Sequence, residues 1–382
     1  MSSGRLGAVV LVALALALGA CTFRTGGGHG GGEARGAGGP LHIRYLGVGG
    51  FLVERGSDAV LTAPLFTRPT WLEVSGGTIA SNPDVVARSL PAPAIANVRA
   101  VLVGHAHYDH LLDVPTVMLG APRATLFGNV STRNVVAAYA PDRAPYCAGR
   151  PAPPGTIARN RVVALDDPGR SFVDYSLCPA RRPPNAPAAG TWVQIPGAAM
   201  RILALCSDHP EQVGPIHYAK GSVDTEQCTP PMRAAEWLEG QTLAFLVDFL
   251  DPASGAPVYR VFYQDAPTNA PVGLVPAAVL REKRIDVALL CVGAYEHVND
   301  APTQTLLGLN PRFAIGGHWE DFLRPASEPV QPIPLMNLDT WVMRARFALP
   351  RGGPPMLENG APMAERFAVP RAGETFDVWP AN

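Results

Sequence analysis

The sequence predicts an α/β (α+β) domain in which strands alternate with helices, and three observations support this class. Short apolar runs rich in valine and leucine recur along the chain, as expected for buried strands. Several of these runs stop at a glycine, a histidine or an aspartate, so that strand ends deliver polar side chains. Hydrophobic residues make up 47% of the 382 residues, which is enough for a large core.

A β-meander opens the predicted domain, because residues 41–46 alternate between apolar and polar positions and a glycine-rich turn follows them. Helices are predicted at 82–90, at 131–140 with Ser131 or Thr132 as the N-cap, and at 275–284. The predicted strands lie at 41–46, 51–54, 59–62, 100–103, 126–128, 161–165, 192–195, 200–205, 243–249, 258–263, 285–292 and 312–315. No repeat with a period of about 20 to 50 residues is visible, which argues against a solenoid.

Residues 1–21 predict a lipoprotein signal peptide. Arg5 precedes an uncharged apolar run that is shorter than the roughly 20 residues a transmembrane helix needs. The run ends in Leu18-Gly19-Ala20-Cys21, which looks like a bacterial lipobox and implies cleavage before Cys21 and lipidation of that cysteine. A plain secretory signal is the alternative. We expect a protein of the bacterial cell envelope that is held to the membrane through the lipid on Cys21 and faces the periplasm or the exterior.

The rest of the chain divides into a Gly-rich linker at 22–40 and a single domain at 41–382. A Pro/Arg-rich insert near 144–196 is expected to shape one rim of the cleft. The formal net charge is −1, so no global field attracts nucleic acid, and no nucleic-acid partner is expected. The expected ligand is a small-molecule or lipid substrate, and the oligomeric state is left open.

Cysteines in an exported protein can form disulfides. Those left after Cys21 are Cys147, Cys178, Cys206, Cys228 and Cys291. We predict that Cys147 pairs with Cys178 across the insert and that Cys206 pairs with Cys228, although four cysteines allow three connectivities. Cys291 lies within an apolar run and is predicted to be a buried free thiol.

The most informative stretch is His105-Ala-His107-Tyr-Asp109-His110, which follows the apolar strand at 100–103. In an extended backbone His105 and His107 point the same way, whereas Asp109 and His110 follow where the chain turns. Three histidines and an aspartate within six residues are costly to bury without a cation. The alternative is that these four are ordinary core residues with hydrogen-bond partners, but so many donors in six residues fit a metal site better. The pattern therefore indicates two metal positions.

Three further strand ends carry candidate ligands: His209, Asp265 and His318. One chemically sensible assignment places His105, His107 and His209 at a first metal. Asp109, His110 and His318 would then hold a second metal, and Asp265 would bridge the two. Zinc accepts such a mixture of nitrogen and oxygen ligands. The competing interpretations are a surface-loop histidine for His209 and a turn aspartate for Asp265.

The pattern His-x-His-x-Asp-His resembles the signature of the metallo-β-lactamase superfamily. Within it, the chain is most similar to the branch containing N-acylphosphatidylethanolamine phospholipase D and ascorbate-6-phosphate lactonase, over most of residues 41–325. Besides the His/Asp signature, the motifs that carry this likeness are Tyr45-Leu-Gly, Val60-Leu-Thr-Ala-Pro-Leu-Phe66, Gly293-Ala-Tyr-Glu296 and His318-Trp-Glu-Asp-Phe322. The resemblance implies a four-layer αββα sandwich of two mixed β-sheets.

The resemblance also implies a function. It predicts a metallo-hydrolase with two Zn²⁺ ions, or Mn²⁺ or Fe in their place, whose bridging hydroxide attacks a phosphodiester or an ester. Asp109 would orient the nucleophile, and His297 would donate a proton or contact substrate, unless it is a loop histidine bonded to the backbone. A lactonase or β-lactamase-like hydrolase is the first alternative, and a non-catalytic metal-binding envelope lipoprotein is the second.

Two positions depart from the branch pattern, and one stretch departs from the more frequent superfamily pattern. Ala63-Pro64 stands where the branch has Asp-Pro, Val48 stands where a histidine is frequent, and Gln264-Asp265-Ala266 replaces Gly-Asp-Thr. An acidic group that could orient a metal ligand is therefore missing at position 63. Such losses commonly cost about 10–100-fold in metal affinity or activity. Metal binding is thus expected more firmly than turnover.

Overall fold

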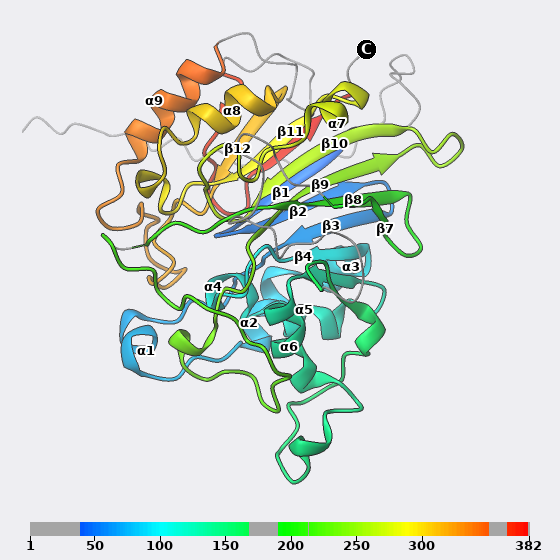
Figure 1. Ribbon diagram of the computed structural model, residues 1–382, viewed down its shortest axis with the longest axis vertical. Coiled ribbons are helices and arrows are strands. Elements are labelled where there is room, and N and C mark those ends of the chain that lie inside the picture. Colours follow the sequence, from blue (N-terminus) through cyan, green and yellow to red (C-terminus); the bar gives the residue numbers. More distant parts are fainter. Residues whose placement is uncertain (1–38, 168–189, 213, 351–364, 381–382) are drawn as a thin grey trace, which may run out of the picture. The chain divides into compact units, whose positions relative to one another are not determined.

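The computed structural model of the chain describes residues 39–167, 190–212, 214–350 and 365–380. The predicted signal peptide, almost all of the Gly-rich linker and Cys178 lie outside the described residues. The remainder forms two seven-stranded β-sheets (Figure 1).

The first sheet has the strand order β14-β1-β2-β3-β4-β5-β6. Its strands are β1 (Leu41–Gly47), β2 (Gly50–Arg55), β3 (Asp58–Thr62), β4 (Val98–Leu102), β5 (Thr125–Gly128), β6 (Val162–Ala164) and β14 (Thr375–Val378). The strands from β14 to β3 pair antiparallel, and those from β3 to β6 pair parallel. The sheet is therefore mixed, and its parallel half directs several strand ends to one edge.

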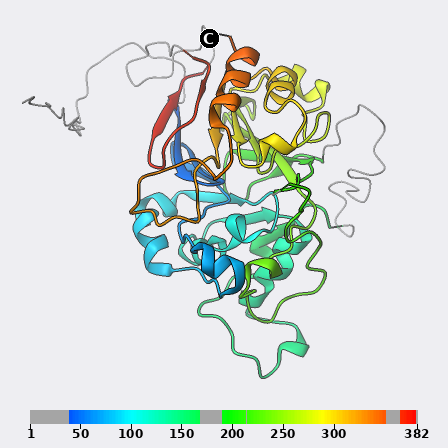
Figure 2. The same ribbon diagram turned by 90° about the vertical axis from the view of Figure 1, so that its left-hand side faces the viewer.

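The second sheet repeats this division, in the order β13-β12-β11-β10-β9-β8-β7. Its strands are β7 (Val193–Gln194), β8 (Met200–Cys206), β9 (Leu243–Leu250), β10 (Pro257–Gln264), β11 (Val287–Cys291), β12 (Phe313–Gly317) and β13 (Phe367–Ala368). The pairs from β7 to β10 are antiparallel, and those from β10 to β13 are parallel. The C-terminal segment completes both sheets, and β14 lies beside β1 (Figure 2).

Helices cover the outer faces of the two sheets (Figure 1). They are α1 (Trp71–Gly76), α2 (Pro83–Ser89), α3 (Ala92–Ala96), α4 (Tyr108–Leu111), α5 (Val114–Gly120), α6 (Val130–Val136), α7 (Ala277–Glu282), α8 (Thr303–Leu309) and α9 (Leu338–Ala348). Short 3₁₀ turns occur at Ala137–Tyr139, Pro145–Cys147, Arg159–Arg161, Ala234–Glu236 and Tyr295–His297.

Three apolar clusters hold these layers together. One lies between the sheets and contains Ile43 and Phe245; a second joins helices such as α5 to the first sheet, and a third joins α8 and α9 to the second. Burial on both faces explains why β9 is buried along its whole length. The predicted four-layer αββα sandwich of two mixed sheets is confirmed.

Several local predictions need correction. Helix α6 begins at Val130, and its cap is Asn129, whose side chain accepts a hydrogen bond from the Thr132 N–H; neither Ser131 nor Thr132 caps it. The third predicted helix is shorter than expected, at Ala277–Glu282. Helix α9, at Leu338–Ala348, was not predicted, because most of its residues are apolar and some of these, such as Met343 and Phe347, are exposed, so its sequence shows no clear apolar face.

The predicted disulfide pairing is wrong. Cys147 is bonded to Cys228, 81 residues away in the sequence, and Cys206 is disulfide-bonded as well. Cys291 is free and buried, as predicted.

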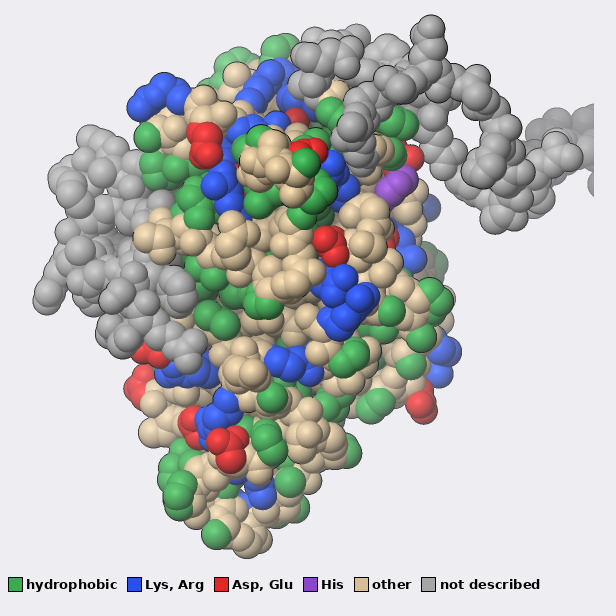
Figure 3. Space-filling model, turned by 90° about the vertical axis from the view of Figure 1, so that its right-hand side faces the viewer, with side chains coloured by type: hydrophobic (Ala, Val, Ile, Leu, Met, Phe, Trp, Pro, Cys, Tyr) green, Lys and Arg blue, Asp and Glu red, His purple; other side chains and the backbone are tan. Residues whose placement is uncertain are grey.

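Among the described residues, no helix has both the length and the apolar character needed to cross a bilayer. On the face drawn in Figure 3, acidic and basic side chains are interspersed among neutral and hydrophobic ones.

Candidate metal centre

The His105–His110 stretch occupies the tight connection between β4 and α4. His107 is the N-cap of α4, so the chain changes from extended to helical between His107 and Asp109. Gly104 allows this connection to approach its neighbours closely, because a Cβ there would lie 2.5 Å from the Leu243 carbonyl oxygen and closer still to Asp265. The strand end is thereby pressed against the residue that follows β10.

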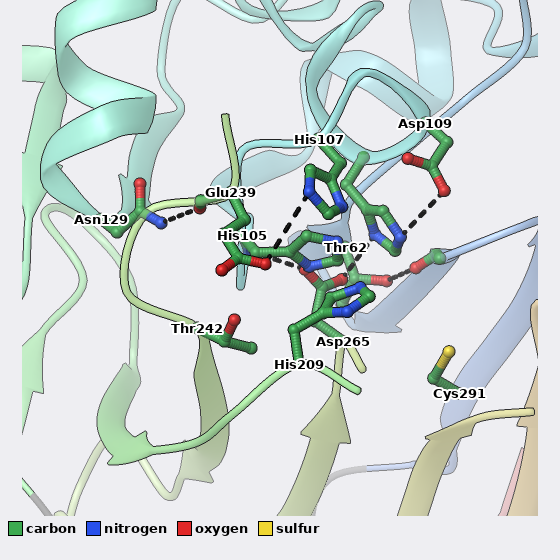
Figure 4. Close-up of polar contacts among 12 residues, drawn as sticks. Thr62, His105, His107, Asp109, Asn129, His209, Glu239, Thr242, Asp265 and Cys291 are labelled. Atoms are coloured by element: carbon green, nitrogen blue, oxygen red, sulfur yellow. Dashed lines mark hydrogen bonds and ion pairs between the residues drawn. The ribbon is translucent and has the colours of Figure 1, made fainter. Parts of the chain in front are cut away.

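His105, His107 and His209 form the first donor group, which we call the inner group. Their ring centroids are 4.7, 4.6 and 4.9 Å apart, and one nitrogen of each lies within 4.8 Å of the others. Figure 4 shows the three imidazoles gathered around one point. Nε2 of His105 is buried and has no hydrogen-bond partner, which is costly unless a ligand accepts its lone pair.

The three imidazoles of the inner group have the protonation state that metal binding requires. Burial, together with the positive charge of His110, lowers the pKa of His105 to about 3. Burial and the neighbouring His209 likewise lower the pKa of His107 to about 3. The pKa of His209 is also well below its ordinary value, because of burial and the neighbouring His105. All three imidazoles are therefore neutral at pH 7, the form that binds a cation.

Asp109, His110 and His318 form the second donor group. Oδ2 of Asp109 lies 3.4 Å from Nε2 of His110 and 3.2 Å from Nε2 of His318. Nδ1 of His318 is buried without a partner. Burial would raise the pKa of Asp109, but His110 more than offsets this and holds it well below its usual range.

His318 adopts a left-handed backbone conformation, with φ of 57°. Its N–H donates to the hydroxyl oxygen of Tyr45 at 2.9 Å, and that hydroxyl donates in turn to the buried carboxylate of Glu320. Glu320 also accepts a 2.9 Å hydrogen bond from the N–H of Val48. This network fixes the end of β12 against β1.

Asp265 lies between the two groups. Its Oδ2 accepts hydrogen bonds from Nδ1 and the backbone N–H of His105 at 2.8 and 2.9 Å, and its Oδ1 accepts one from Nδ1 of His110 at 2.9 Å. Tyr263 donates its hydroxyl to Oδ1 as well. Each carboxylate oxygen thus orients one imidazole, which differs from the predicted role of Asp265 as a bridge between two metals. Nε2 of His105 has no partner, whereas Nε2 of His110 lies 3.4 Å from Asp109 Oδ2.

The charges of His110, Asp265 and Asp109 strongly affect one another's pKa values. Burial would lower the pKa of His110, but the carboxylates of Asp265 and Asp109 raise it to about 10. Burial raises the pKa of Asp265, yet His110 and His105 hold it well below its usual range. A proton therefore occupies His110 in the metal-free site, and a metal that binds there must displace it.

The departure at position 63 has a structural counterpart. Ala63 is fully buried, and a Cβ built on Gly49 would lie 3.0 Å from Ala63 Cβ, 3.0 Å from the Tyr263 hydroxyl and 2.9 Å from His110 Nδ1. The Tyr263 hydroxyl therefore lies in the region beside Ala63 and hydrogen-bonds Asp265 there.

Two donors beside the inner group were not predicted from the sequence. His217 Nε2 donates to Oε2 of Glu239 at 2.5 Å, and the same oxygen lies 3.9 Å from Nε2 of His107. Neither residue follows a strand or a glycine-rich turn, so no local signal marks them. His297, by contrast, is exposed on a 3₁₀ turn and belongs to none of the donor groups found among the described residues. Its role remains a prediction.

No protein-family model matches the chain, and no curated protein matches it. Among solved structures, it is similar to Igni18, a metallo hydrolase from the archaeon Ignicoccus hospitalis, with a TM-score of 0.44 and 12% identity over 88% of this chain and 97% of that one. It is also similar to the diiron β-hydroxylase CmlA from Streptomyces venezuelae (TM-score 0.46, 12% identity, 88% of this chain and 54% of that one).

A third similar structure is described as a Zn-dependent hydrolase of the metallo-β-lactamase superfamily from Thermotoga maritima. Its TM-score is 0.31 at 13% identity, over 79% of this chain and 84% of that one. Similarity at this level says nothing about the substrate of this chain, whose chemistry has to be inferred from its own side chains.

Proposed function

We propose that the protein is a metal-dependent hydrolase with a two-metal centre that cleaves a phosphodiester or an ester. The observation that carries this proposal is the pair of donor groups on either side of Asp265, in which Nε2 of His105 is buried without a partner. Nitrogen and oxygen donors in this mixture suit Zn²⁺, with Mn²⁺ or Fe as alternatives.

The residues fit two cations. The inner group would hold one through three neutral imidazoles, and Asp109, His110 and His318 would hold the other. Bound divalent metals supply Lewis acidity and lower the pKa of water toward neutrality.

The protein residues have separate tasks in this proposal. Asp109 stays ionised, because its pKa is well below its usual range. Its carboxylate can therefore accept a hydrogen bond from the nucleophile and orient it. Asp265 fixes the rings of His105 and His110, so that the two donor groups keep a constant orientation. His297 is kept as the candidate proton donor or substrate contact, and its exposure allows a substrate to reach it.

The proposed location is the cell envelope, with attachment through a lipid on Cys21. The support is the Leu18-Gly19-Ala20-Cys21 sequence after an uncharged apolar run.

Metal analysis with a substrate panel tests the function. Purified protein should contain two equivalents of metal and hydrolyse at least one of a bis-aryl phosphodiester, an aryl ester, a homoserine lactone and nitrocefin. His105→Ala and Asp109→Ala should abolish turnover, and His42→Ala is the control, because His42 is an exposed histidine outside the donor groups.

The panel also decides between the alternatives. Turnover confined to the lactone or to nitrocefin would replace the phosphodiesterase proposal with a lactonase or β-lactamase-like hydrolase. Two bound metals with no turnover on the whole panel would favour the non-catalytic metal-binding lipoprotein. Ala63 and the Gln264-Asp265-Ala266 sequence are the features that favour that second candidate.

A further inference from the structure

A third donor group shares one histidine with the inner group, and its other two residues have no part in the proposed chemistry. It consists of His209, His217 and Glu239, whose ligand atoms lie within 4.8 Å of one another. The His209 and His217 rings are 5.5 Å apart, and His217 is bonded to Glu239. We call these three residues the outer group. Two imidazoles and a carboxylate are a frequent ligand set for a divalent transition metal.

His209 belongs to both the inner and the outer group but can bind only one metal at a time. Its Nδ1 lies 2.7 Å from the carbonyl oxygen of Pro210, and a carbonyl can only accept a hydrogen bond. Nδ1 therefore carries the proton, and the amide of Gln212, at 3.3 Å, is the weaker neighbour. One lone pair remains, on Nε2. A metal on His209 consequently occupies either the inner or the outer position.

Exposure decreases from the outer group to the inner one. The side chains of His217 and Glu239 are 13% and 11% exposed, whereas those of His107 and His105 are 7% and 1% exposed. A cation that approaches the inner group from solvent therefore meets His217 and Glu239 before His107 and His105, whereas Asp109 of the second donor group is itself 13% exposed. Glu239 lies close to both groups, since its Oε2 contacts His217 of the outer group and lies 3.9 Å from Nε2 of His107 in the inner group.

The outer group is held in a fixed position relative to the inner one. The backbone carbonyl of Glu239 accepts hydrogen bonds from the Ala106 N–H at 2.8 Å and from the Asn129 side chain at 2.7 Å. Ala106 separates His105 from His107, so the Glu239 loop is tied directly to the inner ligands. Figure 4 shows Glu239 beside His107, with Asp109 on the other side of that ring.

We propose that His209, His217 and Glu239 form a capture site that takes up a divalent transition metal from solvent and passes it to the inner group. On capture, His209, His217 and Glu239 would replace water molecules of the hydrated cation, and the proton shared by His217 and Glu239 would leave to solvent. On transfer, His105 and His107 replace His217 and Glu239, while His209 stays bound throughout. The inference rests on the proposed metal centre, and it assigns a role in metal loading to residues outside that centre.

Metal uptake by the apo-protein tests the proposal. The full chain is stripped with a chelator and mixed with Co²⁺, and the visible absorbance of bound Co²⁺ is followed by stopped flow. In His217→Ala and Glu239→Gln, uptake should slow by roughly tenfold or more, while the final content stays at two equivalents. Glu239→Gln keeps the shape of the side chain and the backbone carbonyl that anchors the loop, so the fold is preserved. His42→Ala should take up Co²⁺ at the wild-type rate.

The outcomes separate this proposal from the proposed function. Uptake at the wild-type rate in both variants would overturn the capture site alone. A final content below two equivalents in the variants would also overturn it, because His217 or Glu239 would then be a permanent ligand or a support for one. A wild-type protein that binds no Co²⁺ would instead overturn the two-metal hydrolase on which both depend.

Discussion

The hydroxyl oxygen of Tyr45 accepts a 2.9 Å hydrogen bond from the backbone N–H of His318, where His318 adopts a φ of 57°. A side chain at such a φ costs about 1–2 kcal/mol. The strained residue is the one that presents an imidazole to the second donor group. Tyr45 and its partner Glu320 therefore stabilise a conformation that the backbone of His318 would not adopt on its own.

Tyr45→Phe should remove metal from the second group and leave the inner group loaded. The metal content is expected to fall from two equivalents toward one, because His318 loses the bond that fixes its backbone. The free energy of unfolding should fall by about 1–3 kcal/mol, since the buried Glu320 also loses a partner. Mass-spectrometric metal analysis and urea denaturation measure the two effects. Tyr259→Phe, which removes a hydroxyl bonded to the Gly39 carbonyl, should keep both metals.

Asp265→Asn should weaken both metal positions together. An amide at this position offers one accepting oxygen and one donating NH₂ group, so it cannot accept from both His105 and His110. We expect about a 10–100-fold loss of metal affinity, measured by competition with a chelating dye. Asp224→Asn, an exposed aspartate, is the matched control. Loss of one metal alone would contradict the shared orienting role of Asp265.

The metal-free protein should lose stability as the pH falls from about 6.5 toward 3. The folded-state pKa values of His105 and His107 are about 3, so these rings bind protons only in the unfolded chain across that range. Each such group lowers the free energy of unfolding by up to about 1.4 kcal/mol for each pH unit of acidification. His110 affects stability at alkaline pH. Because its folded-state pKa is about 10, its contribution to the free energy of unfolding is fully present below pH 6.5 and is lost as the pH rises toward 10. Urea denaturation of the apo-protein at several pH values checks both slopes, and His107→Gln should reduce the acid slope.

Gly104→Ala should disrupt the metal centre. Its Cβ would collide with the Leu243 carbonyl and with Asp265, so the His105 loop and the Asp265 loop must separate. We expect loss of bound metal together with a lower melting temperature. Gly76→Ala is the control, because no atom lies within 4 Å of its added Cβ. Full metal content in Gly104→Ala would show that the loops can separate without affecting the ligands.

The sequence alone was sufficient to predict the strand ends and their donors. His105, His107, Asp109 and His110 are neighbours in the chain, and His209, Asp265 and His318 each follow a buried strand. Such information is local, because an apolar run and the polar residue that ends it are read from the same few positions. The sandwich of two mixed sheets was expected from the resemblance, because local patterns do not say which strands pair.

Only the tertiary structure decided which distant residues meet. The bond from Cys147 to Cys228, the contact of Glu239 with His217 and the approach of Tyr45 to His318 all depend on the path of the chain between elements. No local pattern encodes that path, because loop residues pair according to where the packed sheets and helices bring them. The orienting contacts of Asp265 belong to the same class. Its position after β10 was visible in the sequence, but the two nitrogens it faces were set by packing two sheets against each other.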